Sequence, residues 1–229
     1  MRIEGERALV TGGNAGLGFA VAEALLEKGA DVVICGRSED KLREATEKLG
    51  TEKIAFVVCD VSDPEAVDRM AKEVGNVDIL VNNAGVFLDG ELTSYSIEEI
   101  NRVVDVNLKG VLFVTHKFLP AMKDAKKGFI VNVSSTSGLN PREGQSVYVA
   151  SKYGVTGFTD VLRRDLHGSG VKVAGFYPGG MSTELFKKAD SEIDSKTFMD
   201  PKEVAQKIMS IIETGDGMVV EKTVVTRDS

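Results

Sequence analysis

The stretch Thr11-Gly12-Gly13-Asn14-Ala15-Gly16-Leu17-Gly18 decides the fold, because it joins a short apolar run to an amphipathic one. Residues 7–11 before it predict a buried strand, and residues 17–28 after it predict a helix. Glycines at such a junction permit a tight turn and let the backbone approach a pyrophosphate, while the start of the helix offers free N–H groups to an anion. A crowded turn without a ligand is the alternative, but the strand before and the helix after favour a dinucleotide site. We assign this site to Thr11, Gly12, Asn14, Gly16, Leu17 and Gly18.

The remainder of the chain repeats the alternation of strand and helix. Strands are expected at residues 31–35, 54–59, 77–81, 128–133, 171–177 and 218–226, and helices at 41–49, 64–74, 97–122, 147–166 and 203–212. The stretch 97–122 is expected to be one long helix with a bend near residues 101–105. Apolar strands that alternate with helices form a parallel sheet covered on both faces. The sequence therefore predicts an α/β fold in three layers: a Rossmann-type, doubly wound parallel sheet of about seven strands with helices on both faces.

No linker or internal repeat divides the chain, so residues 1–229 are expected to form a single dinucleotide-binding and catalytic domain. The composition is typical of a globular protein, with 42% hydrophobic and 28% charged residues. The net charge of -7 argues against a nucleic-acid partner, which needs a basic face. The start of the chain lacks the apolar core of a signal peptide, and no run reaches the length of a membrane span, so a cytoplasmic location and no membrane partner are expected.

The two cysteines, Cys35 and Cys59, lie in apolar strand-like runs and are expected to be reduced core residues. No cluster of histidine and cysteine has the spacing of metal ligands, so no metal site is expected.

Three polar residues after the fifth predicted strand suggest acid–base chemistry. Tyr148 and Lys152 are four positions apart on a predicted helix and therefore share one face. The pKa of tyrosine is about 10, and a neighbouring ammonium together with an oxidised nicotinamide is expected to lower it. Tyr148 could then exchange a proton with a carbonyl or alcohol oxygen, which the hydroxyl of Ser135 could hold. Alternatively, Tyr148 and Lys152 are two exposed residues of a helix and Ser135 is an ordinary turn residue. The catalytic interpretation is favoured because the three residues occur together and in order after the glycine loop.

With these motifs the chain resembles the short-chain dehydrogenase/reductase family. The matches are Thr11-Gly12-x-x-x-Gly16-x-Gly18, Asp60-Val61, Asn82-Asn83-Ala84-Gly85, Asn107, Ser135, Tyr148-x-x-x-Lys152 and Pro178-Gly179 with Thr183. The resemblance implies an oxidoreductase that transfers a hydride between a nicotinamide dinucleotide and a carbonyl compound or secondary alcohol.

The resemblance also implies a role for each matched residue. Tyr148 would be the general acid and base, Ser135 would orient the carbonyl, and Lys152 would lower the pKa of Tyr148 and hold the nicotinamide ribose. Asn107 would bend its helix so that a backbone carbonyl holds a water in a proton relay to Lys152. The other implied cofactor contacts are Asp60 and Val61 beside the adenine, Asn83, Ala84 and Gly85 along the cofactor, and Pro178, Gly179 and Thr183 around the nicotinamide.

The end of the second predicted strand bears on the choice between NADP(H) and NAD(H). Sites specific for NAD place an acidic residue there, whereas this chain has Gly36 followed by Arg37 and Ser38. The guanidinium fork of Arg37 suits a phosphate, and Ser38 could add a donor or simply cap the next helix. Ala15 stands where many NADP-preferring relatives carry a basic residue. We expect a preference for NADP(H), with NAD(H) as a second cofactor.

Substrate specificity is expected to depend on residues 86–92, 139–145 and 180–200, which do not identify the substrate. The last stretch contains Leu185, Phe186, Lys187 and Lys188, then Asp190, Glu192 and Asp194, and a solvated helix explains these charges as well as a charged substrate does.

Residues 103–122 and 147–166 carry more apolar side chains than one covered face requires, so a homodimer or homotetramer is expected. The family often ends in a glycine-rich tail, and the ending Val225-Thr226-Arg227-Asp228-Ser229 favours the dimer.

Three other functions remain open: a catalytically silent nicotinamide-binding interaction protein, an NAD-dependent alcohol dehydrogenase, and an epimerase or dehydratase on a related fold. The intact Ser135, Tyr148 and Lys152 disfavour the first, and the short chain disfavours the last.

Overall fold

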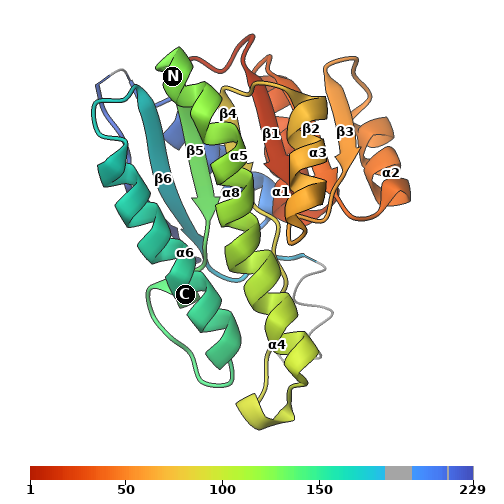
Figure 1. Ribbon diagram of the computed structural model, residues 1–229, viewed down its shortest axis with the longest axis vertical. Coiled ribbons are helices and arrows are strands. Elements are labelled where there is room, and N and C mark those ends of the chain that lie inside the picture. Colours follow the sequence, from red (N-terminus) through yellow and green to blue (C-terminus); the bar gives the residue numbers. More distant parts are fainter. Residues whose placement is uncertain (184–197, 216, 229) are drawn as a thin grey trace.

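The computed structural model describes residues 1–183, 198–215 and 217–228. Its strands form one sheet in the order β3-β2-β1-β4-β5-β6-β7, and every neighbouring pair is parallel (Figure 1). The strands are β1 Arg7–Thr11, β2 Asp31–Gly36, β3 Ile54–Val58, β4 Ile79–Asn82, β5 Gly128–Val133, β6 Val171–Pro178 and β7 Lys222–Val225. The predicted doubly wound sheet is confirmed. The order reverses between β1 and β4, and ligands of such sheets bind in the crevice at that reversal.

Helices cover both faces of the sheet. They are α1 Gly16–Glu27, α2 Glu39–Leu49, α3 Pro64–Val74, α4 Ile97–Val104, α5 Gly110–Ala125, α6 Ser146–Asp165 and α8 Pro201–Ile212. One apolar core lies between the sheet and α1, α2 and α8, and a second lies between the sheet and α3, α5 and α6 (Figure 1). The strands supply alternate residues to the two cores: Val10 and Ile34 to the first, and Leu9 and Val33 to the second. No helix among the described residues is both long and apolar enough to cross a membrane.

The long helix predicted for residues 97–122 is continuous, and a π-helical segment lies where the expected bend would end and just beyond it. Helix α4 passes through the π-helical segment Asp105–Lys109 into α5. A π segment inserts an extra residue into the helical path and is often found at functional sites. Asn107 lies within this segment and is fully buried.

The last strand is shorter than predicted. The sequence indicates residues 218–226, whereas β7 spans Lys222–Val225. Pairing with β6 begins at the contact between Gly175 and Lys222, and the apolar Met218 and Val219 before it remain exposed. The apolar residues before Lys222 therefore make the predicted strand too long, because they do not pair with β6.

Buried side-chain hydrogen bonds attach α6 to the middle of the sheet. The amide nitrogen of Asn82 donates to Thr115 Oγ1 at 2.9 Å and to Asn132 Oδ1 at 2.8 Å. Asn132 Nδ2 in turn donates to Thr159 Oγ1 at 2.9 Å. The chain of bonds joins β4 and β5 to α5 and α6. Because buried polar groups must be paired, it fixes how α6 lies on β5.

The first prediction concerns this attachment. Thr159→Val keeps the shape of the side chain but leaves the buried amide of Asn132 without its acceptor. We expect the free energy of unfolding in urea to fall by about 1–3 kcal/mol. The matched control is Thr46→Val on α2, where the hydroxyl donates to the Arg43 carbonyl near solvent, and there we expect a change within about 0.5 kcal/mol. Equal losses in the two variants would contradict the proposed attachment.

Candidate active site

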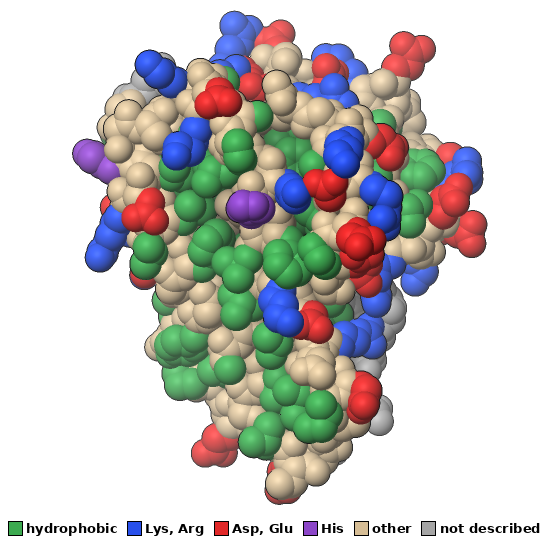
Figure 2. Space-filling view, in the orientation of Figure 1, with side chains coloured by type: hydrophobic (Ala, Val, Ile, Leu, Met, Phe, Trp, Pro, Cys, Tyr) green, Lys and Arg blue, Asp and Glu red, His purple; other side chains and the backbone are tan. Residues whose placement is uncertain are grey.

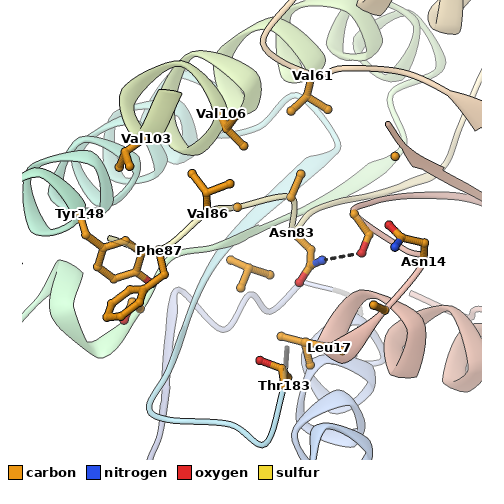
Figure 3. Close-up of a pocket in the computed structure, with 18 of the residues that line it drawn as sticks. Asn14, Leu17, Val61, Asn83, Val86, Phe87, Val103, Val106, Tyr148 and Thr183 are labelled. Atoms are coloured by element: carbon orange, nitrogen blue, oxygen red, sulfur yellow. Dashed lines mark hydrogen bonds between the residues drawn. The ribbon is translucent and has the colours of Figure 1, made fainter. Parts of the chain in front are cut away.

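A cavity of about 550 Å³ lies across the carboxyl ends of the strands, at the reversal between β1 and β4 (Figure 3). The loops that follow β1 to β6 all contribute to its wall. The predicted site residues that line it are Gly12, Asn14, Gly16, Leu17, Arg37, Ser38, Asp60, Val61, Asn83, Ala84, Gly85, Ser135, Tyr148, Lys152, Pro178, Gly179 and Thr183. Thr11, Gly18 and Asn107 lie behind this wall. Residues predicted from separate motifs are thus brought to one cavity.

Thr11 and Asn83 hold the two loops at the centre of the cavity together. Thr11 Oγ1 accepts hydrogen bonds from the backbone nitrogens of Asn83 at 2.9 Å and Ala84 at 3.0 Å. Asn83 Nδ2 donates to the carbonyls of Thr11 at 3.0 Å and Gly12 at 3.3 Å (Figure 3). Thr11 is 2% exposed, so its hydroxyl is engaged within the protein.

The glycine loop leaves space that side chains would fill. Gly12 and Gly16 have positive φ angles of 65° and 55°, which favour glycine. A Cβ atom on Gly18 would lie 2.2 Å from the carbonyl oxygen of Gly12, so α1 can approach the loop only with glycine at this position. The first turn of α1 has neither a side-chain cap at Ala15 nor an acidic residue. Its N–H groups therefore suit an anion such as a pyrophosphate.

Basic side chains line the cavity beyond β2. Arg37 Nη1 lies 4.0 Å from Asp60 Oδ2, and both side chains are partly exposed. Ser38 caps α2, since its side chain accepts a hydrogen bond from the backbone nitrogen of Lys41 at 3.5 Å. This is the capping role that the sequence analysis gives as the alternative to a phosphate contact. Lys41 also lines the cavity, and the described residues show no carboxylate within 4.0 Å of its ammonium. This end of the cavity is the one suited to a phosphate.

Tyr148, Ser135 and Lys152 meet at the other end. Tyr148 is 5% exposed, and its ring makes an edge-to-face contact with Phe87, with centroids 4.8 Å apart. Ser135, whose Oγ accepts from the backbone nitrogen of Ser137 at 3.1 Å, lines the same cavity. Lys152 Nζ donates to the carbonyl of Val133 at 3.1 Å and lies 5.7 Å from the centroid of the Tyr148 ring.

Burial controls the ionisation of this pair. It raises the pKa of Tyr148 to about 12, and the nearby Ser135 hydroxyl partly offsets this rise. It lowers the pKa of Lys152 to about 8. Burial and Ser135 set the pKa of Tyr148 here, and the lowering expected from Lys152 together with an oxidised nicotinamide remains a prediction. The phenol therefore holds its proton at neutral pH and is ready to donate it.

Asn107 connects the cavity wall to α6 through its side chain. Its Oδ1 accepts from the backbone nitrogen of Val86 at 2.8 Å, and its Nδ2 donates to the Val86 carbonyl at 2.9 Å and to Ser151 Oγ at 3.1 Å. Ser151 lies on α6 between Tyr148 and Lys152. The Asn107 amide therefore links the loop after β4 to α6, the helix that carries Tyr148 and Lys152.

Thr183 Oγ1 is buried and has no hydrogen-bond partner among the described residues. Its methyl carbon lies 3.1 Å from the place of a Cβ atom on Gly16, and Thr183 lines the cavity beside the glycine loop. Within the part of the chain that the structure describes, no group of three or more His, Cys, Asp or Glu side chains could hold a metal ion.

The sequence analysis missed part of the cavity wall. The lining residues to which it gives no part in the site are Lys41, Cys59, Glu99, Arg102, Val103, Val106, Val133 and Ser134. Val103 and Val106 are three positions apart, a spacing that also suits a helix face buried in a core. Lys41 follows Ser38 by three positions in the first turn of α2, which is the one signal that could have placed it near Arg37.

The three stretches expected to set specificity have different outcomes. Val86, Phe87 and Leu88 from the first line the cavity. The second contacts the first, since Gly90 N donates to the Gly144 carbonyl at 2.7 Å. From the third, Met181 and Thr183 line the cavity, and residues 184–197, with all the charges noted there, lie outside the described residues.

Known proteins are similar to this chain in sequence and in architecture. A family model described as short chain dehydrogenase matches residues 6–194. An uncharacterized oxidoreductase of Staphylococcus aureus strain N315 is 34% identical over 206 residues, covering 88% of each chain. A solved structure of actinorhodin polyketide ketoreductase with NADPH is similar with a TM-score of 0.87 and 31% identity, covering 97% of this chain and 96% of that one. A 3-ketoacyl-(acyl-carrier-protein) reductase from Brucella melitensis complexed with NADH gives a TM-score of 0.91 and 28% identity, covering 98% of each chain.

The second prediction concerns the burial of Lys152. Its pKa is about 8 in the folded protein against an ordinary value of 10.5, so between these values the unfolded chain binds more protons than the folded one. The contribution of Lys152 to the free energy of unfolding must therefore rise with pH between about 8 and 10.5. We expect the difference in unfolding free energy between the cofactor-free wild type and Lys152→Met to increase by on the order of 2 kcal/mol from about pH 7 to pH 10.

Lys123→Met, which removes an exposed lysine at the end of α5, is the matched control and should show no such rise. A flat or falling difference for Lys152→Met would show that burial does not penalise its ammonium.

Proposed function

The chain belongs to the short chain dehydrogenase family and is an NAD(P)-dependent oxidoreductase, and we propose that it interconverts carbonyl compounds and secondary alcohols with Tyr148 as general acid and base. The observation that carries this proposal is the convergence of Ser135, Tyr148 and Lys152 at one end of a cavity whose other end is a glycine loop. We also propose that residues 1–229 act as one domain on a small-molecule substrate in the cytoplasm.

The described residues fit a nicotinamide dinucleotide. The glycine loop leaves space that Cβ atoms would fill. The Thr183 hydroxyl, which has no hydrogen-bond partner among the described residues, is suited to a polar edge of the nicotinamide. When bound, the nicotinamide supplies or accepts the hydride. The residues that would hold the cofactor are Gly12, Asn14, Gly16, Leu17, Arg37, Ser38, Asp60, Val61, Asn83, Ala84, Gly85, Tyr148, Lys152, Pro178, Gly179 and Thr183, with Thr11 and Gly18 supporting the loop from behind.

The proton chemistry follows from the ionisation of the site. In the reducing direction the Tyr148 hydroxyl gives its proton to the carbonyl oxygen as negative charge develops there, and Ser135 holds that oxygen by a hydrogen bond. The phenolate left behind is stabilised by Lys152, which is mostly protonated at neutral pH because its pKa is about 8. Asn107 is a positioning residue, and the proposed relay of protons to Lys152 uses a water on the backbone carbonyl of its π segment.

We propose a preference for NADP(H), with NAD(H) as a second cofactor. Arg37 and Lys41 place two cations beside the cavity, and Gly36 offers no carboxylate to repel a phosphate. Asp60 lies near Arg37 and offsets part of that charge, so the preference is not absolute.

A homodimer or homotetramer is proposed as the assembly. Ile97 on α4 and Tyr153 and Val161 on α6 are exposed apolar residues, at 66%, 41% and 56%. Figure 2 shows hydrophobic side chains gathered over the face formed by α4, α5 and α6. Burying such a face removes it from water, which favours association.

The third prediction tests the acid–base assignment. Tyr148→Phe keeps the ring but removes the hydroxyl, so we expect turnover with NADPH and a carbonyl substrate to fall at least about 100-fold. Binding of NADPH, measured by its fluorescence, should be nearly unchanged. The control is Tyr153→Phe on the same helix, where the hydroxyl donates to the Leu139 carbonyl and activity should be retained. Near-native turnover in Tyr148→Phe would overturn the assignment.

The fourth prediction tests cofactor preference. The wild type should have the higher kcat/KM with NADPH, and Gly36→Asp should shift the ratio toward NADH by at least about tenfold, because placing like charges together costs several kcal/mol. A side chain at position 36 must displace Asn14 Oδ1, which lies 2.9 Å from a Cβ there, so Gly36→Asn controls for size without charge. A wild type that prefers NADH, or equal shifts in the two variants, would contradict the assignment to a phosphate.

A further inference from the structure

Phe87 lies directly against the tyrosine that carries the proton. The two ring centroids are 4.8 Å apart and the rings are nearly perpendicular, at 80°. This edge-to-face arrangement is a favourable one for aromatic pairs. Both residues line the same cavity, and Figure 3 shows their rings together at one end of it. Phe87 therefore occupies space next to the group that would meet a carbonyl oxygen.

The backbone on both sides of Phe87 is held in place. On one side, the N–H and carbonyl of Val86 bond the buried amide of Asn107 at 2.8 and 2.9 Å. On the other side, Gly90 N donates to the Gly144 carbonyl at 2.7 Å. The Tyr95 hydroxyl donates to that same carbonyl at 3.3 Å. A loop held at both ends keeps the Phe87 ring from moving away when a larger molecule enters.

The same amide also sets the position of Tyr148. Asn107 Nδ2 donates to Ser151 Oγ at 3.1 Å, and that hydroxyl donates to the Tyr148 carbonyl at 2.7 Å. The spacing between Phe87 and Tyr148 is thus fixed by one buried side chain that contacts both segments. Their rings lie side by side in the cavity wall.

We propose that Phe87 is a specificity-determining residue that limits the size of the carbonyl substituents beside Tyr148. Leu88, Val133 and Met181 add apolar surface to the same cavity. The substrates are therefore compact ketones and aldehydes with apolar substituents, together with the corresponding alcohols. This inference rests on the proposed function, since it concerns which carbonyl compounds that chemistry accepts.

The experiment compares a series of ketones from butanone to propiophenone with the full chain and whichever of NADPH and NADH the wild type uses. The wild type should have the higher kcat/KM for butanone. Phe87→Ala should raise the ratio of propiophenone to butanone at least about tenfold, because even one methylene in a pocket is worth about 10–200-fold. Phe87→Leu should shift the ratio in the same direction by less.

Leu88→Ala is the matched control, since Leu88 lies on the same loop and lines the same cavity but is not the residue in ring contact with Tyr148. Its ratio should rise less than that of Phe87→Ala, because Leu88 adds apolar surface to the cavity but Phe87 is the residue in ring contact with Tyr148. An unchanged ratio in an active Phe87→Ala, an equal shift in Leu88→Ala, or a wild type that prefers propiophenone would overturn the inference. If Phe87→Ala does not fold, an unchanged ratio in Phe87→Leu overturns it instead. A wild type that reduces no ketone or aldehyde with either cofactor would reject the proposed function itself.

Discussion

The hydrogen bonds of the buried Asn107 amide are the interaction on which the site depends. They join the loop after β4, the π segment between α4 and α5, and α6. Parallel strands bring their carboxyl ends to a common edge, but the loops beyond that edge are free to move unless such bonds hold them. Thr11 and Asn83 perform the same task between the loops after β1 and β4. The cavity is therefore shaped in part by the side chains of Asn107 and Thr11, which do not line it.

Desolvation then gives the two ends of the cavity different chemistry. At the Tyr148 end, burial favours the uncharged form of both ionisable groups, so the phenol keeps its proton and the ammonium of Lys152 is easily neutralised. At the other end, the guanidinium of Arg37 is partly exposed. One end is thus suited to moving a proton, and the other to holding an anion. This division agrees with an NAD(P)-dependent oxidoreductase.

The sequence predicts features that depend on local pattern, and it fails where tertiary contacts decide. The alternation of apolar runs and amphipathic stretches is local, so the sheet and the gathering of Ser135, Tyr148 and Lys152 could be predicted. The π segment could not be predicted, because Asn107 within it bonds residues that lie 21 and 44 positions away in the sequence. The raised pKa of Tyr148 depends on burial, and the role of Phe87 depends on a contact with a ring 61 positions later, so neither leaves a pattern in the sequence.

The most direct test of this account follows the hydrogen itself. The purified chain is given a compact ketone and NADPH or NADH carrying deuterium at the transferred position of the nicotinamide, and the alcohol is analysed by mass spectrometry. The account predicts one deuterium on the carbinol carbon, formed by the wild type and at a rate greatly reduced in Tyr148→Phe. Alcohol without deuterium, or labelled alcohol formed equally fast without the Tyr148 hydroxyl, would contradict it.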